Sequence, residues 1–310
     1  MIQNSDSVGQ QFLANLQTLQ QQMASTQAQV SSGYRVNQVS DDPGSVADIL
    51  ELESNLGSVN QVASNLSSVS GEVNTAEGAL ESATQLLEQA TSLGAQGANS
   101  TNSASEQTGL SQQVEQILSQ LVSISSTTFE GQYIFSGNQT SSPSYQLDPT
   151  SPTGVTQLIT NPANRLIQDA SGVTFAVSET AAEIFDSRDS TGQPDASNVF
   201  FAVKSLATAL ASNDQSAITT AMSSLQAASD YLAQQLQFYG GVQDQIANAT
   251  SVAQKFQLQD QTTLGDVRNT NMASASVDLA REQTSYQAAI QAESTVPRTS
   301  LFNFLTSSGG

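Results

Sequence analysis

The stretch FLANLQTLQQQMASTQAQV, residues 12–30, decides the fold of this chain. Its seam positions step by four, three, four, three and four residues, which places them on one narrow stripe of a helix, the a/d seam of a coiled coil. The seam positions are Phe12, Leu16, Leu19, Met23, Thr26 and Val30. No charged side chain occurs from Ser7 to Tyr34. Because so narrow a stripe buries little area, this helix needs a second helix to pack against.

The far end of the chain supplies a candidate partner. A helical pattern runs through residues 218–295 with no proline before Pro297, and it predicts a nearly continuous helix about 115 Å long. Its last apolar positions are Leu264, Val267, Ala280, Ala288 and Ile290. We therefore expect the two ends of the chain to pair as a coiled coil.

Composition narrows the possible functions. The 310 residues carry a net charge of −20, with 28 acidic and 8 basic side chains, so a surface that binds nucleic acid or an acidic membrane is excluded. Cysteine and histidine are both absent, which removes thiolate chemistry, the commonest metal ligand and the usual proton-transfer group. An enzyme is therefore not expected.

The sequence contains no run of apolar residues long enough to span a bilayer, and we predict no membrane insertion. Its start has no basic segment followed by an apolar run, so we expect no cleaved signal peptide. Export would then use a route that removes no leader.

Two further helices follow the first. Asp42 and Pro43 have the chemistry of an N-cap and a first helical residue, which predicts a helix over residues 43–93. We assign Asp41 and Asp42 to capping rather than acid–base chemistry, because adjacent residues on a turn point apart. Small polar residues at 94–105 predict a turn, and heptad spacing at 110–124 predicts the second arm of a helical hairpin.

The helical period disappears in the middle of the chain. Residues 141–194 hold five of the seven prolines, and we call this segment the insert. Short strands are predicted at 155–160, 165–168 and 173–177, with a hairpin turn beginning at Asp169. Helix is expected again from about residue 196, and the pair Gly240–Gly241 predicts a bend or a close helix contact.

These patterns predict a mainly α protein, an elongated rod of long heptad-patterned helices from both chain ends with a small β-rich central insert. We expect three domains: residues 1–36 with 275–310 as a terminal coiled coil, residues 37–140 with 195–274 as a helical bundle, and residues 141–194 as the insert. No catalytic, cofactor-binding or metal-binding motif is present, so no cofactor is expected. An apolar cluster near the carboxy terminus is expected to be buried, either against the seam of residues 12–30 or in a neighbouring subunit, and to contribute to assembly: Leu301, Phe302, Phe304 and Leu305.

Three motifs carry a resemblance to a known family. SSGYRV at 31–36 followed by SDDP at 40–43 resembles the amino-terminal signature of bacterial flagellins and of the hook-associated protein at the hook–filament junction. FEGQYIFSG at 129–137, and YQAAIQA at 286–292 with SLFNFL at 300–305, resemble the junction protein more closely. The signature positions are Arg35, Asp41, Asp42, Pro43, Gly131, Tyr133, Phe135 and Gly137. One departure is NTNMA at 269–273, where the family implies acidic residues.

The resemblance implies a structural role in the flagellum. Paired termini would line the inner tube, the helical domains would pack around it, and the insert would face outward. It implies export as an unfolded chain through the flagellar type III channel, an export chaperone at the carboxy terminus, and an extracellular location. The partners would be further copies in a helical array and the neighbouring axial proteins, hook-associated protein and flagellin.

We therefore expect a structural subunit that joins hook to filament, with Phe12, Leu16, Leu19, Met23 and Val30 as assembly contacts. A flagellin that forms the filament itself is the first alternative. A coiled-coil surface adhesin is a more distant one, and would bind a host ligand with termini that fold in isolation. An enzyme would reveal itself by reproducible turnover.

Overall fold

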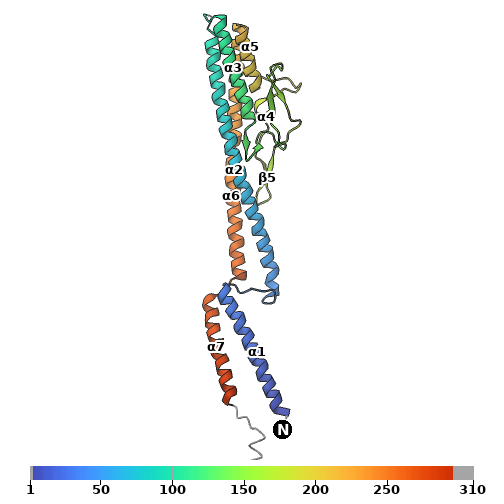
Figure 1. Ribbon diagram of the computed structural model, residues 1–310, viewed down its shortest axis with the longest axis vertical. Coiled ribbons are helices and arrows are strands. Elements are labelled where there is room, and N and C mark those ends of the chain that lie inside the picture. The colour runs from blue at the N-terminus through green and yellow to red at the C-terminus, as the bar shows by residue number, and fades with distance from the viewer. Residues whose placement is uncertain (1–2, 100, 296–310) are drawn as a thin grey trace, which may run out of the picture. The chain divides into compact units, whose positions relative to one another are not determined.

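The protein is mainly helical, as the heptad patterns predict. The computed structural model describes residues 3–99 and 101–295, with side chains described for residues 9–99 and 101–292. Figure 1 shows long helices from both ends of the chain and a small β-rich region built from its middle. The helices are α1 (Gln3–Ser32), α2 (Pro43–Gly97), α3 (Ala104–Ser125), α4 (Ala181–Phe185), α5 (Val199–Ala211), α6 (Gln215–Arg268) and α7 (Met272–Thr295).

The chain divides into two compact units. The larger unit is Ser58–Gln257, and the smaller combines the described residues up to Gly57 with those from Leu258 onward. The division into three domains that we expect from the sequence remains a prediction.

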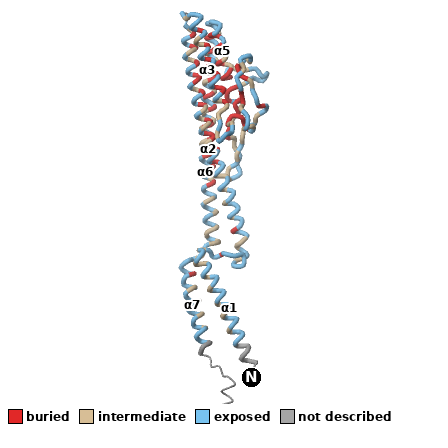
Figure 2. Tube along the Cα trace, in the orientation of Figure 1, coloured by how far each residue is buried: buried red, intermediate tan, exposed pale blue. Residues whose placement is uncertain are grey.

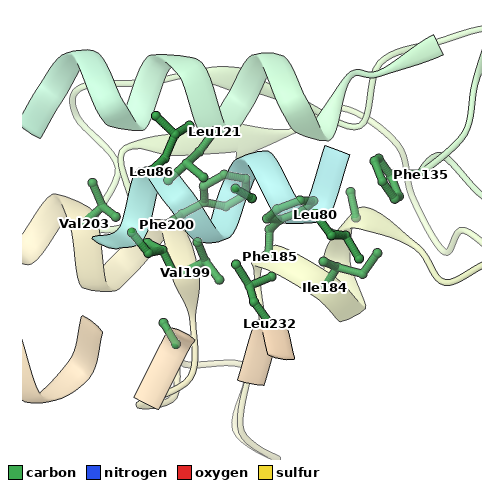
Figure 3. Close-up of a cluster of buried hydrophobic side chains, with 14 of the residues drawn as sticks. Leu80, Leu86, Leu121, Phe135, Ile184, Phe185, Val199, Phe200, Val203 and Leu232 are labelled. Atoms are coloured by element: carbon green, nitrogen blue, oxygen red, sulfur yellow. The ribbon is translucent and has the colours of Figure 1, made fainter. Parts of the chain in front are cut away.

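In the larger unit, α2, α3, α5 and α6 share one hydrophobic core. Within this unit, the apolar residues at heptad spacing in α2 and α3 are buried or half-buried. This burial confirms the heptad pattern expected from the sequence. Helix α5 packs beside α3, where Ser111 donates a hydrogen bond to the Ala207 carbonyl at 2.8 Å. Figure 3 shows side chains from these helices meeting around Phe185 and Phe200, whose rings stack with centroids 5.7 Å apart.

The middle of the chain forms three two-stranded antiparallel sheets. Each strand has two or three residues, and each pair is a local hairpin, so the helical bundle supplies most of the stability here. The predicted turn beginning at Asp169 joins the last pair. The pairs are β1 (Thr128–Phe129) with β2 (Gln132–Tyr133), β3 (Tyr145–Leu147) with β4 (Val155–Gln157), and β5 (Leu166–Gln168) with β6 (Thr174–Ala176).

Side-chain caps define where several helices begin. Asp42 accepts from the Ser45 amide at 3.2 Å and precedes Pro43, so the predicted N-cap of α2 is confirmed. Ser103 and Glu106 form a reciprocal capping box at the start of α3. Capping side chains of this kind fix the residue at which each of these helices begins.

The second half of the chain differs from the sequence-based expectations in three places. The helix predicted over 218–295 is interrupted between Arg268 and Met272, where the Asn271 side chain accepts from the amides of Ala273 and Ser274 and caps α7. Residues Gly240–Gly241 lie inside helix α6, and a Cβ atom on either would meet open space, so the close contact is absent and the bend stays a prediction. The short helix α4 was not predicted, because five residues are too few to display a period.

Candidate assembly interface

Helices α1 and α7 lie side by side and antiparallel in the smaller unit (Figure 1). From Gly9 to Ser32 the half-buried side chains of α1 are the six predicted seam positions and Gln29, while the remainder are exposed. The sequence therefore located the packed face of α1 correctly. Figure 2 shows the consequence, since this pair carries little fully buried surface compared with the core of the larger unit.

The face that α7 turns toward α1 differs from the predicted one. Ala280, Ala288 and Ile290 are exposed. The side chains shielded from solvent are instead Ala275, Leu279, Glu282, Tyr286 and Ala289, which step by four, three, four and three residues. The same heptad spacing would have located them if glutamate and tyrosine had been admitted to the seam.

Two polar contacts cross between these helices. Gln20 donates from Nε2 to the Tyr286 hydroxyl at 2.8 Å, and Thr26 donates from Oγ1 to Glu282 Oε1 at 3.2 Å. Such rungs fix the relative register of two helices, at a cost in stability compared with apolar seam residues. We define the α1–α7 pair, with this seam, as the candidate assembly interface.

The first motif holds the loop that follows α1. Arg35 donates from Nη1 to Asp42 Oδ2 and from Nη2 to the Val267 carbonyl, each at 2.8 Å. Asp41 accepts from the amides of Asn37 and Gln38 at 2.9 and 2.8 Å. These residues therefore tie the start of α2 to the end of α6.

Hydrogen bonds explain the acidity of Asp42. The Ser45 hydroxyl donates to its carboxylate at 2.6 Å, and this bond, followed by the one from Arg35, lowers the pKa of Asp42 to about 2. The pKa is depressed because donors stabilise the ionised form. The carboxylate is a fixed anion in this loop, which agrees with capping and gives it no proton to exchange near neutral pH.

Sequence reasoning missed the residues opposite this loop. Arg268 lies over the Tyr34 ring, 4.1 Å from its centroid, and donates to Glu53 at 2.7 Å. The Arg35 amide donates to the Arg268 carbonyl at 2.7 Å, and the Thr270 amide donates to the Gly33 carbonyl at 3.0 Å. No motif marked Arg268, although it is one of only 8 basic residues, and that scarcity was an available signal.

The second motif lies in the larger unit and has a structural role. Glu130 and Gly131 have φ of 51° and 81°, the left-handed pair of a tight hairpin turn between β1 and β2, with Tyr133 on the second strand. Phe135 is fully buried and meets Phe185 edge to face, with ring centroids 5.9 Å apart. Gly137 has φ of 60°. The two motifs are thus placed in separate units, and both stabilise local geometry.

Leu301, Phe302, Phe304 and Leu305, the predicted carboxy-terminal contacts, lie outside the described residues. Within residues 3–99 and 101–295, no helix combines the length and apolar character needed to cross a membrane. In the same part of the chain, no group of three or more acidic residues is arranged to hold a metal ion.

The amino-terminal part of the chain matches a known sequence family. Residues 4–140 match the model described as the bacterial flagellin N-terminal helical region. This range contains helices α1, α2 and α3 and the first two sequence motifs, at residues 31–43 and 129–137. Over these residues the chain resembles the bacterial flagellin N-terminal helical region. No curated protein matches the sequence.

Several solved structures have a fold similar to that of this chain. A protein of Vibrio parahaemolyticus described as a flagellar hook-associated protein is 20% identical, with a TM-score of 0.64, and the match covers 74% of this chain and 100% of that one. Flagellar hook-associated protein 3 of Legionella pneumophila is 13% identical with a TM-score of 0.61, covering 71% and 98%. The flagellar junction protein FlgL of the same species is 12% identical with a TM-score of 0.53, covering 65% and 99%.

At these identities the solved structures establish the fold, and it is the fold of the flagellar hook-associated proteins. The match over residues 4–140 and the shared fold both agree with the resemblance drawn from the sequence motifs.

Proposed function

We propose that this chain is a structural subunit of the bacterial flagellum that joins the hook to the filament. The observation that carries the proposal is the fold, since this chain covers 98–100% of the hook-associated and junction proteins described above. The match of residues 4–140 to the flagellin N-terminal region supports a place in the same axial structure. The protein would act by packing, with no catalysis and no cofactor.

Assembly would proceed through the α1–α7 pair. The α1 surface is uncharged from Ser7 to Tyr34, so neighbouring subunits could cover it without burying an unpaired charge. Subunits that meet head to tail form an open helical array. The proposed assembly contacts are Phe12, Leu16, Leu19, Met23 and Val30 of α1, with Leu301, Phe302, Phe304 and Leu305 of the carboxy terminus.

The remaining expectations belong to the same proposal. Residues 1–36 with 275–310 would line the inner tube, residues 37–140 with 195–274 would pack around it, and residues 141–194 would face outward. The partners would be further copies, hook-associated protein, flagellin, and an export chaperone at the carboxy terminus. The protein would be extracellular, exported without a cleaved leader.

A flagellin that forms the filament is the alternative that a specific observation favours, because the matching family model is that of the flagellin N-terminal region. Electron microscopy of a deletion strain separates the two functions. Loss of a junction protein should leave hooks without filaments and release flagellin monomers into the medium. Hooks and junctions that remain in place, without a filament and without released flagellin, would favour the alternative.

Complementation tests the assembly contacts. Leu16→Asp puts a charge into the half-buried seam and should reduce filament-bearing cells by at least tenfold. Leu166→Asp is the matched control, because Leu166 is 63% exposed on β5, and it should restore filaments as the unmodified chain does. Full restoration by Leu16→Asp would contradict the proposed role of the seam.

A further inference from the structure

The segment Ser178–Glu183 lies within the insert, follows β6 and contacts helix α6, and we call it the strap. The Glu179 amide donates to the Tyr239 hydroxyl at 3.3 Å, and the Tyr231 hydroxyl donates to the Glu183 carbonyl at 2.6 Å. Two tyrosines of α6 therefore hold the backbone of the strap. The Ser178 hydroxyl accepts from the Arg165 amide at 3.2 Å and joins the strap to the start of β5.

One carboxylate of the strap has its donors supplied. Glu183 accepts from the amide and the hydroxyl of Thr180 at 2.9 Å each, which completes the capping box of α4. Its other oxygen accepts from Asn164 Nδ2 at 3.2 Å. Both carboxylate oxygens of Glu183 therefore have hydrogen-bond donors.

The other carboxylate, Glu179, has an environment that opposes charge. It is half-buried, and its Oε2 atom is buried with no hydrogen-bond partner among the described residues. An ionised oxygen in such a place loses hydration without replacement. Burial, followed by the neighbouring Glu183 carboxylate, raises the pKa of Glu179 to about 7.

The elements packed around the strap add negative charge. On α2, Glu72 accepts from Arg165 at 2.5 Å, so this guanidinium is already engaged. Burial, together with the carboxylates of Glu179, Glu72 and Glu183, raises the pKa of the Tyr239 hydroxyl. Burial, Glu179, Asp195 and Glu183 raise the pKa of Tyr231, opposed by a hydrogen bond with Gln235. Both tyrosines therefore remain neutral donors or acceptors across the ordinary pH range.

We propose that Glu179 is a proton-dependent clamp, which keeps the strap docked on α6 while its carboxyl group is protonated and loosens that contact when it ionises. The residues involved lie outside the assembly interface, so the clamp goes beyond the proposed function. Its effect would be to make docking of the insert weaker in neutral and alkaline solution than in mild acid.

The sign follows from the raised pKa. In the unfolded chain the Glu179 carboxyl has its ordinary pKa of 4.5, whereas in the folded chain its pKa is about 7. The stabilising contribution is therefore complete below pH 4.5 and is lost as the pH rises through 7. Since the chain contains no histidine and no cysteine, few other groups titrate in this window.

The test is the folding equilibrium of the full chain, measured by chemical denaturation at pH 5.5, 7 and 8. With carboxyl pKa values of 4.5 in the unfolded chain and about 7 in the folded chain, the folding constant of the unmodified chain should fall about 30-fold from pH 5.5 to pH 8. Glu179→Gln, which carries no charge at any pH, should remove most of that dependence. Glu88→Gln is the control, because Glu88 is an exposed carboxylate on α2, and it should keep the dependence of the unmodified chain.

Hydrogen exchange of the strap amides, corrected for intrinsic rates, gives a local measurement. Protection at residues 179–184 should decrease between pH 5.5 and 8 in the unmodified chain and stay constant in Glu179→Gln. Stability that is independent of pH in the unmodified chain, or an unchanged dependence in Glu179→Gln, would overturn the proposal.

Discussion

At the scale of single residues, the scarce arginines connect segments that are distant in sequence. Arg35 and Arg268 join the loop after α1 to the ends of α2 and α6, and Arg165 joins the insert to α2. Arg188 acts locally instead, donating to the buried Asp186 carboxylate at 2.9 Å and to the Gly192 carbonyl at 3.0 Å. A planar guanidinium with several donors can satisfy a carboxylate and a carbonyl at once, which a lysine does poorly.

Gly137 illustrates a residue whose identity follows from backbone geometry. Its φ is +60°, and a Cβ atom there would lie 2.5 Å from the Ala163 carbonyl oxygen. Gly137→Ala should therefore lower the free energy of unfolding by more than the ~1–2 kcal/mol of the left-handed conformation alone. Chemical denaturation of the full chain measures the change.

Gly192→Ala is the control that separates the two effects. Gly192 has φ of +81°, but a Cβ atom there would meet nothing within 4 Å. This variant should show the conformational cost of ~1–2 kcal/mol without the clash. Equal losses in the two variants would mean that the backbone near Ala163 yields, and the predicted clash would be wrong.

At the scale of elements, the pairing of α1 with α7 depends on which face α7 presents. Leu279 is shielded in the seam whereas its neighbour Ala280 is exposed. Leu279→Asp should therefore abolish hydrogen-exchange protection along α1 in the isolated chain, because an unpaired charge would enter the seam. Ala280→Asp should leave that protection within about twofold of the unmodified chain. The reverse result would restore the register expected from the sequence.

The success of sequence-based prediction differs between helices for a physical reason. In α2 and α3, leucine, isoleucine and valine hold the seam and polar residues hold the other faces, so the period is unambiguous. In α7, alanines occur on several faces while Glu282 and Tyr286 occupy the seam, so hydrophobicity identifies the wrong stripe. The stop before Met272 depends on a side-chain cap at Asn271, with no proline or glycine to mark it.

Some parts of the candidate site could be predicted from the sequence and others could not. The α1 seam and the Asp42 cap followed from spacing and capping chemistry, which are local properties. The contacts of Arg268 with Tyr34 and Glu53, and the environment of Glu179, depend on segments brought together from far apart in the chain. A single sequence carries no local signal for such contacts.

At the scale of the whole molecule, the two units differ in how much core they hold. Among the described residues, the buried hydrophobic side chains outside Ser58–Gln257 are Val36, Ile49 and Ala275. The smaller unit therefore depends on half-buried seams and polar ties, which contribute little net stability each. This asymmetry suits a protein whose terminal helices are completed by neighbouring subunits.

The asymmetry predicts that the fragment Ser58–Gln257 folds without the rest of the chain. It should unfold in one cooperative thermal transition, followed by circular dichroism, because it retains nearly the whole buried hydrophobic cluster. Leu206→Ala, at a fully buried position of α5, should cost about 2–5 kcal/mol in the fragment and the same amount in the full chain. A gradual transition in the fragment, or a smaller effect of Leu206→Ala there, would show that the core needs the terminal helices to form.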